Sequence, residues 1–222
     1  MNAGFEDLSL PLPFAASDPA AARVEIAADA VLLRGFVATA PLRTAIESVA
    51  MAAPFRRLQT LNGGQMSVAM TNCGSWGWHS DRRGYRYLTT DPLSGRPWPP
   101  MPAEFAALAT AAASVAGFPG FAPDCCLINR YVVGAQMGAH RDHDELEMRH
   151  PIVSVSIGLP ATFLWYGASR KGPPLSIAVT DGDVVVFGGS ARSGYHGVRR
   201  LAAPPGAAPE LQRHNLTFRR AK

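Results

Sequence analysis

The chain of 222 residues contains 47% hydrophobic residues and has a mean hydropathy of +0.02, as expected for a soluble globular protein that buries a large core. Its formal net charge of +4 is compatible with a polyanionic partner but is too small to establish one. The sequence has no long apolar run and no basic leader, so we expect no membrane span, no secretory signal and a cytoplasmic location. We also expect a monomer.

The cysteines argue against two kinds of structural site. Cys73, Cys125 and Cys126 form an odd set with one adjacent pair and no Cys-x-x-Cys spacing. A disulfide framework needs an even set, and a structural zinc site needs spaced ligands. The sequence predicts neither, which suits a reducing compartment.

The N-terminal part predicts a lead-in, a strand and a supporting helix. Residues 1–23 are rich in proline, alanine, serine and acidic residues and predict a flexible lead-in, so the fold should begin near Val24. The apolar run at 30–36 predicts a strand, and Thr39 predicts the N-cap of a helix with Pro41 in its first turn. One face of this helix consists of Leu42, Ile46 and Val49.

Residues 60–98 predict β-hairpins, because glycine-rich turns separate short strand patterns. The same region interleaves aromatic residues with arginines, which suits stacking on bases next to phosphates. The alternative is that the tryptophans belong to the core of a small sheet, and we favour it for Trp76. The candidate stacking surface consists of Trp76, Trp78, Tyr85 and Tyr87 with Arg82, Arg83 and Arg86.

The second half of the chain predicts one packing helix followed by many short strands. Residues 102–116 place Phe105, Leu108, Ala112 and Val115 at helical spacing. Strand patterns follow at 127–132, 151–166, 176–180, 183–188 and 213–219, with a hairpin turn at Asp181 and Gly182 and a surface loop at 202–209. These elements predict a mainly β fold with flanking helices (α+β), built on a double-stranded β-helix, or jelly-roll, core.

The stretch around His140 predicts a metal site. His140 and Asp142 lie two residues apart just after a strand pattern, so their side chains point to the same side of an extended segment. His196, after a second strand-rich region, completes two histidines and one carboxylate. This set is the facial triad of non-haem Fe(II) oxygenases, which leaves positions open for a co-substrate and dioxygen. The alternative for His140 and Asp142 is an exposed, charged turn.

The C-terminal segment predicts a strand with one polar face. Arg213 and Arg219 on that face suit the two ends of a short dicarboxylate, because a guanidinium binds a carboxylate through two parallel hydrogen bonds. The alternative is a basic, solvated edge strand. The polar face consists of Arg213, Asn215, Thr217 and Arg219, and the opposite face consists of His214, Leu216 and Phe218.

In this order, the segments resemble the AlkB family of Fe(II)- and 2-oxoglutarate-dependent dioxygenases, specifically its bacterial nucleic-acid demethylases. The matching segments are SVAMTNCGSWGW, DPLSGRPWPPMP, LINRYVVGA, HRDHDE, PIVSVSIGLPATF, GDVVVFGG, YHG and RHNLTFR. They extend from about residue 30 to the C-terminus, and this coverage is much more specific than any single motif.

The resemblance implies three sets of site residues, with Fe(II) as the metal and with 2-oxoglutarate and O2 as co-substrates. The catalytic residues and metal ligands are His140, Asp142 and His196. The 2-oxoglutarate site consists of Asn129, Tyr131, Arg213, Asn215 and Arg219, with one arginine at each carboxylate end. The substrate-binding residues are Trp78, Tyr85, Asp144 and Arg170.

The implied function is oxidative demethylation of N-alkylated bases, such as 1-methyladenine and 3-methylcytosine, in DNA, with RNA as a further substrate. Hydroxylation of the alkyl group would release an aldehyde and restore the base, which must leave the duplex to be reached. The implied organisation is an N-terminal extension with a nucleotide-recognition hairpin lid at 24–101. The dioxygenase core at 102–222 would form one compact unit with this lid.

Three positions depart from the family pattern and leave the substrate preference open. Arg141 stands where a glutamine is familiar, His143 where a lysine is familiar, and His214 where a tyrosine is familiar. Two further functions stay open: a related dioxygenase acting on tRNA, protein or a small molecule, and a non-enzymatic jelly-roll binding protein.

Overall fold

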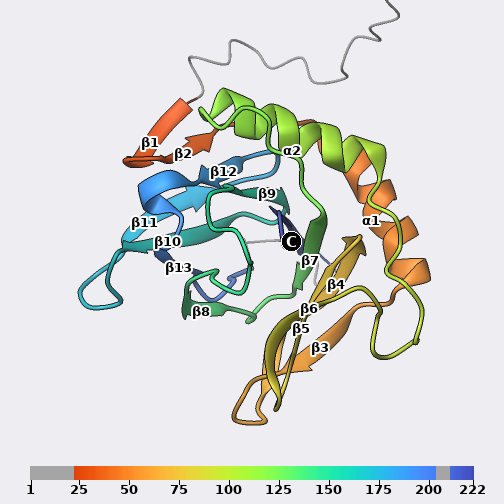
Figure 1. The fold of residues 1–222 in the computed structure, drawn as a ribbon. Helices are drawn as coiled ribbons and strands as arrows, with labels where there is room; N and C mark the ends of the chain where they lie inside the picture. The colour runs from red at the N-terminus through yellow and green to blue at the C-terminus, as the bar shows by residue number, and fades with distance from the viewer. Residues whose placement is uncertain (1–22, 204–210) are drawn as a thin grey trace, which may run out of the picture.

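A computed structural model describes residues 23–203 and 211–222 (Figure 1). Most of the predicted lead-in and of the predicted loop at 202–209 lies outside these described residues. Arg23, the last residue of the predicted lead-in, already begins the first strand. The helices are α1 (Ala40–Ala52), α2 (Ala103–Val115) and the short 3-10 helix η1 (Gly189–Ala191).

The strands form three antiparallel sheets. The order in the major sheet is β1 (Arg23–Ala27), β2 (Ala30–Leu33), β12 (Val184–Phe187), β9 (Ile152–Gly158), β14 (Arg213–Arg219), β7 (Cys125–Tyr131), β4 (Gln65–Gly74) and β3 (Arg56–Gln59). The order in the minor sheet is β11 (Leu175–Val179), β10 (Ala161–Gly167), β13 (Tyr195–Val198) and β8 (Met137–His140). The third sheet is the hairpin of β5 (Gly77–Asp81) and β6 (Gly84–Leu88).

Helices α1 and α2 cover the outer face of the major sheet (Figure 1). Side chains alternate along each strand, so every second residue faces the helices. In β14, Leu216 and Phe218 are fully buried in this outer core, where Phe218 meets Phe105 of α2 edge to face at 5.9 Å. The predicted apolar face of this strand is therefore confirmed.

The inner face of the major sheet lies against the minor sheet. An apolar cluster with Leu32, Phe163, Trp165 and Phe187 fills part of the space between the two sheets. Phe163 and Phe187 also line a cavity, so the cavity opens where this cluster ends. Two facing antiparallel sheets with helices on one side confirm the predicted jelly-roll fold.

The predicted hairpin turn at Asp181 and Gly182 is wrong. Strand β11 pairs with β10 in the minor sheet, whereas β12 pairs with β2 and β9 in the major sheet, so this turn carries the chain from one sheet to the other. Gly182 has φ +84°, and a Cβ atom there would lie 2.5 Å from the carbonyl oxygen of Val37. Glycine is therefore required by the close packing of this crossover.

The two predicted helices are confirmed, with local corrections. Thr39 occupies the N-cap position, but its hydroxyl donates to Asp181 Oδ2 at 2.7 Å and makes no capping hydrogen bond. Val115 is exposed, and Ala109 and Ala113 complete the buried face of α2 in its place. The strand predicted at 30–36 ends at Leu33. Within the described residues, neither helix has the length and apolar character of a membrane span.

The N-terminal half is shared between the major sheet and the hairpin. Strand β2 pairs with β12 and strand β4 pairs with β7, so the major sheet joins both sides of the boundary predicted at residues 101 and 102. Division at this boundary stays a prediction. The β5–β6 hairpin, predicted from its turn residues, projects next to β3 and β4 (Figure 1).

Candidate active site

All twelve residues predicted to bind metal, 2-oxoglutarate or substrate line one cavity of about 450 Å³. Its floor consists of strands β7 and β14 of the major sheet together with the predicted metal ligands, two on strands β8 and β13 of the minor sheet and one just after β8. The hairpin contributes Trp78 and Tyr85. Residues separated by more than a hundred positions therefore meet because the two sheets face each other.

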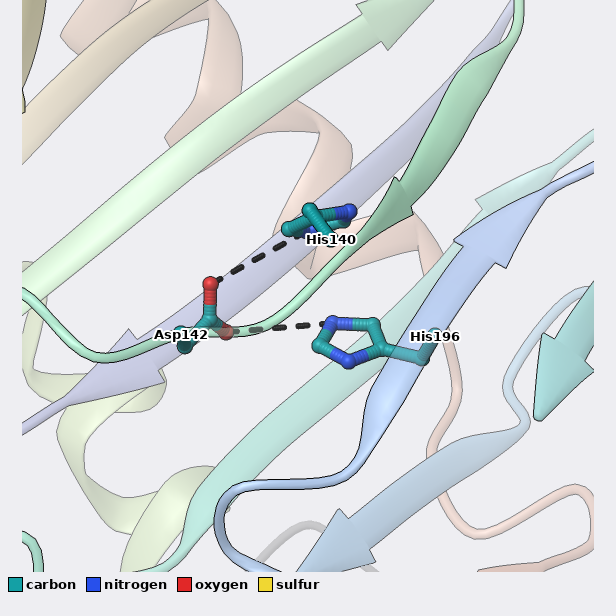
Figure 2. Close-up of side chains that lie close together, drawn as sticks. All are labelled: His140, Asp142 and His196. Carbon is teal, nitrogen blue, oxygen red and sulfur yellow. Dashed lines mark ion pairs between the residues drawn. The ribbon is translucent and has the colours of Figure 1, made fainter. Parts of the chain in front are cut away.

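The three predicted metal ligands lie together (Figure 2). His140 ends β8 and is the cross-strand partner of His196 in β13, and Asp142 follows just after the end of β8. The Nε2 atom of His140 lies 3.9 Å from Asp142 Oδ1, and the Nε2 atom of His196 lies 3.8 Å from Asp142 Oδ2. One ligand atom from each residue lies within 4.8 Å of the others.

Both imidazoles are held in the form that a metal requires. The Nδ1 atoms of His140 and His196 lie 2.9 and 3.0 Å from the carbonyl oxygens of Gly138 and Gly194. A carbonyl only accepts hydrogen bonds, so each Nδ1 carries a hydrogen, and in the neutral ring Nε2 then keeps a free lone pair. Burial and the neighbouring His140 lower the pKa of His196 to about 4, which keeps its ring neutral.

The Asp142 carboxylate is buried and ionised. Burial alone would raise its pKa, but the charge of the neighbouring Arg219 opposes burial, and the pKa lies well below its usual value. Arg219 Nη2 lies 2.9 Å from Asp142 Oδ2, yet this oxygen accepts no well-aligned hydrogen bond from the described residues. A buried anion facing two imidazole lone pairs fits a divalent cation.

The predicted 2-oxoglutarate residues come from adjacent strands. In the pairing of β14 with β7, Arg213 lies opposite Tyr131 and Asn215 lies opposite Asn129. Arg213 and Arg219 are buried, and among the described residues Arg213 Nε and Nη1 and Arg219 Nη1 have no hydrogen-bond partner. Buried guanidinium donors without partners are costly unless a ligand satisfies them, and a carboxylate matches their geometry.

Two alternatives that involve no ligand, the solvated edge strand and the exposed turn, are wrong. Strand β14 lies between β9 and β7, so the basic residues do not belong to a solvated edge strand. Asp142 is buried, so the His140 and Asp142 pair is not simply an exposed turn.

Tyr131, another predicted 2-oxoglutarate residue, is buried. Burial raises its pKa to about 12, which leaves its hydroxyl protonated and able to donate a hydrogen bond.

The predicted substrate residues line the outer part of the cavity. The rings of Trp78 and Tyr85 lie 5.4 Å apart at 30°, and Trp78 Nε1 donates to Asp144 Oδ2 at 3.0 Å. Arg170 lies across the cavity mouth with its guanidinium 5.9 Å from the ring centre of Tyr195. Aromatic faces and a carboxylate therefore share one wall.

Other members of the candidate stacking surface have structural roles. Tyr87 is buried and donates to Glu145 Oε1 at 2.6 Å. Both terminal nitrogens of Arg86 bond Asp81, at 2.7 and 2.8 Å. Trp76 is partly buried and does not line the cavity, which agrees with the core role favoured for it. Only Trp78 and Tyr85 of the seven candidates line the cavity.

The three departures from the family pattern lie in two places. Arg141 and His143 line the cavity at its exposed mouth, and Arg141 lies 5.5 Å from the ring centre of Tyr195. His214 lies on the opposite face of β14, with its ring 5.7 Å from Phe55. Only Arg141 and His143 are therefore placed to contact a substrate.

Sequence reasoning missed part of the cavity lining. Tyr195 directly precedes His196 in the YHG segment, and this position could have indicated it. The apolar lining residues carried no signal, because strand residues of the same type fill the rest of the core. They include Met66, Met70, Leu127, Ile152, Phe163 and Phe187.

Comparison with known proteins places this site in a family. A family model described as the 2OG-Fe(II) oxygenase superfamily matches residues 29–219. The alpha-ketoglutarate-dependent dioxygenase AlkB of Escherichia coli is 48% identical over 198 residues, which cover 88% of this chain and 92% of that relative. The AlkB homolog of Caulobacter vibrioides is 46% identical over 186 residues, which cover 81% of this chain and 82% of that relative.

A solved structure supports the same assignment. The structure of OsALKBH1 matches with a TM-score of 0.75 and 26% sequence identity, covering 89% of this chain and 99% of that chain. The fold, the facing triad and the length of the sequence match agree with one another. This chain belongs to the AlkB family of Fe(II)- and 2-oxoglutarate-dependent dioxygenases.

Proposed function

We propose that this protein removes alkyl groups from N-alkylated bases in nucleic acids by Fe(II)- and 2-oxoglutarate-dependent hydroxylation. The observation that carries the proposal is one cavity that combines a metal triad, unpaired guanidinium donors and a stacking aromatic wall. A relative from Arabidopsis thaliana, 38% identical over 81 residues, is named a DNA N(6)-methyladenine demethylase.

His140, Asp142 and His196 would hold Fe(II) through two Nε2 atoms and one carboxylate oxygen. When bound there, Fe(II) with 2-oxoglutarate and dioxygen supplies the oxidation of an alkyl C–H bond to C–OH, while 2-oxoglutarate loses CO2 and becomes succinate. The neutral His196 imidazole and the ionised Asp142 carboxylate need no proton transfer before they bind a cation.

Arg213 and Arg219 would bind the two carboxylates of 2-oxoglutarate from the floor of the cavity. Arg213 Nη2 already donates to Ser156 Oγ at 3.2 Å, so its remaining donors are held toward the cavity. Tyr131, Asn129 and Asn215 surround these arginines and would donate or accept the remaining hydrogen bonds. The co-substrate would therefore be oriented by rigid strands rather than by loops.

The hairpin would act as the nucleotide-recognition lid within the predicted extension at 24–101. Trp78 and Tyr85 offer aromatic faces to an extruded base, and Asp144 offers a carboxylate to its edge. Methylation that blocks base pairing lowers the cost of extrusion, so the damage itself favours entry. All twelve residues come from one chain, so we take the protein to act as a monomer.

The product of hydroxylation would complete the repair without further oxidation. An N–CH2OH group loses the proton of its hydroxyl as its N–C bond breaks, and the base nitrogen receives the electron pair. Formaldehyde leaves, and the unmodified base returns to the stack. None of these proposed steps breaks the glycosidic bond.

The test is mass spectrometry of oligonucleotides that contain 1-methyladenine or 3-methylcytosine. They are incubated with the protein, Fe(II), ascorbate and 2-oxoglutarate, as single-stranded DNA, duplex DNA and RNA. We expect demethylated product together with succinate. Turnover of 2-oxoglutarate without demethylation would indicate a different substrate, and the absence of Fe(II)-dependent turnover would indicate a binding protein.

A further inference from the structure

A buried ion pair lies beside the cavity and includes none of the predicted metal, co-substrate or substrate residues. Arg192 Nη2 lies 3.0 Å from Glu145 Oε2, and the two side chains are 3% and 1% exposed. Such a pair gives up hydration, so it is weak evidence for stability by itself. The contacts that surround it indicate a positional role.

Arg192 bridges the two ends of the segment at 141–151, which follows β8 and contains no helix or strand. Its Nη1 donates to the carbonyl oxygen of Asp142 at 2.8 Å, and its Nε donates to the carbonyl oxygen of His150 at 2.8 Å. No strand pairing holds this segment, which we call the ligand segment. One guanidinium therefore holds both ends of the segment, and between them the N–H of Leu146 donates to the carbonyl oxygen of Ala221 at 3.2 Å.

Glu145 extends this contact to the co-substrate arginine. Its Oε1 accepts a hydrogen bond from the Tyr87 hydroxyl at 2.6 Å and lies 3.2 Å from Arg219 Nε. Arg219 Nη2 in turn lies 2.9 Å from Asp142 Oδ2. Arg192 thus reaches Asp142 twice, through the main chain directly and through Glu145 and Arg219.

The base of Arg192 is itself fixed. It directly follows helix η1, and Ser190 in η1 donates its N–H and its hydroxyl to Asp29 Oδ2 at 2.9 and 2.7 Å. The N–H of Gly188, before η1, donates to the carbonyl oxygen of Asp29 at 3.0 Å. The Arg192 side chain can fix other groups only if its own main chain is fixed, and these hydrogen bonds hold the preceding residues in place.

We propose that Arg192 is a positioning residue, which fixes the main chain of Asp142 and, through Glu145, the guanidinium of Arg219. This inference rests on the proposed metal role of Asp142. Arg192 touches neither the metal ligand atoms nor the cavity. Its planar fork donates to two carbonyl oxygens and holds its third nitrogen beside Glu145 at fixed angles. Lysine cannot reproduce this geometry although it keeps the charge.

The test is the affinity of metal-free protein for Mn(II), followed by electron paramagnetic resonance of free Mn(II) without oxygen turnover. Loss of a group that orients a metal ligand weakens metal binding by about 10- to 100-fold, and we expect a change of this size for Arg192→Lys. Hydrogen exchange should quicken in the ligand segment. The kcat for 2-oxoglutarate turnover should fall while the KM for a methylated oligonucleotide changes little.

Arg56→Lys is the matched control. Arg56 is partly buried and also forms an ion pair, 2.7 Å from the buried Asp91, but neither residue lines the cavity. We expect this variant to lower the melting temperature and to leave the Mn(II) affinity unchanged. A second control, Arg149→Lys, changes an exposed arginine of the ligand segment and should alter neither quantity.

The inference is overturned if folded Arg192→Lys binds Mn(II) within twofold of the wild type, on the order of measurement error, and only melts earlier, as Arg56→Lys should. If Arg192→Lys does not fold, Glu145→Gln serves instead, because it keeps the side-chain shape and weakens the same contacts. Its unchanged Mn(II) affinity would overturn the inference too. A wild type that binds Mn(II) but demethylates nothing contradicts the proposed function alone.

Discussion

The floor of the cavity and its rim differ in how their charges are neutralised. On the floor, Asp142 is buried and lies within ion-pair distance of Arg219. Beside the floor, the buried Glu145 lies within ion-pair distance of both Arg219 and Arg192. At the rim, Arg141 and Arg170 are exposed and form no ion pair with any described residue. The buried acids are paired with arginines, whereas the cations of the rim have no acidic partner within the described part of the chain.

Buried and exposed charges differ in how much their removal costs. Removing one partner from a buried charge network leaves an uncompensated charge, which costs about 3–5 kcal/mol. An exposed charge is screened by water and salt, and its loss costs about 0–1 kcal/mol. We therefore expect substitutions on the floor to abolish chemistry and substitutions at the rim to adjust substrate preference.

The largest effect is expected for Asp142→Ala, which should abolish turnover, whereas a substitution at the rim should only change substrate affinity. It removes one of three protein ligands, so Fe(II)-dependent conversion of 2-oxoglutarate to succinate should fall below detection. Nuclear magnetic resonance of succinate measures this. Glu147→Ala, an exposed acid in the same segment, is the control. Normal iron-dependent turnover by Asp142→Ala would remove Asp142 from the metal site.

The next effect concerns the co-substrate on the floor. Arg213→Lys keeps the charge but loses the bidentate fork, so 2-oxoglutarate should bind about 1–3 kcal/mol more weakly. Titration in the presence of Mn(II) measures this affinity without turnover. Arg199→Lys changes an exposed arginine outside the cavity and should have no effect. Equal affinities of Arg213→Lys and wild type would contradict the assignment of this arginine.

Trp78→Ala tests whether the aromatic wall of the cavity stacks on the substrate base. Stacking contributes roughly 1–3 kcal/mol per base, so the KM for a methylated oligonucleotide should rise by roughly 5- to 150-fold. The affinity for 2-oxoglutarate should stay unchanged. Trp76→Ala is matched in chemistry but lies outside the cavity. If Trp78→Ala lowers the affinities for the oligonucleotide and for 2-oxoglutarate equally, Trp78 has a packing role and does not recognise the base.

His214 lies outside both the floor and the rim, and its burial should make the stability of the protein depend on pH. Burial, Arg130 and Arg43 lower its pKa to about 4 in the folded state, compared with about 6.5 unfolded. The folded state disfavours the charged ring, so stability is complete above pH 6.5 and falls as the pH drops toward 4. His214→Phe should reduce this loss by about 2–3 kcal/mol in urea unfolding at pH 4, with little change at neutral pH. Parallel pH profiles for both proteins would disprove this.

The smallest effect is expected at the rim. Arg170→Gln removes an exposed cation without an ion-pair partner, so the KM for an oligonucleotide should rise only about 2- to 5-fold at low salt. Because exposed charges are screened, the difference should disappear as the salt concentration rises. A loss that persists at high salt would indicate a direct hydrogen bond to the base.

Local sequence patterns were sufficient for most of the elements. Apolar residues at helical spacing located α1 and α2, and turn residues located the β5–β6 hairpin. The pattern at Asp181 and Gly182 misled, because a glycine turn between two strands looks the same within one sheet and between two sheets. Pairing partners far away in the chain decide between these cases.

The candidate site shows the same division of information. Spacing placed Arg213 and Asn215 on one face of a strand, because side chains alternate strictly along extended backbone. Composition grouped Tyr87 and Arg86 with Trp78. In the structure they have other roles, because Tyr87 binds the carboxylate of Glu145 and Arg86 binds that of Asp81. Composition cannot tell which of several aromatic residues is buried.

By itself, the sequence determined the residue types of the site, the alternation of its strands and the family to which the chain belongs. Only the tertiary structure decided that the basic strand lies in the middle of a sheet and that Arg192 spans the ligand segment. Local rules act over a few neighbouring residues, whereas Arg192 contacts a carbonyl oxygen 50 positions away in the chain. Such contacts depend on how two sheets face each other, and no local pattern encodes that arrangement.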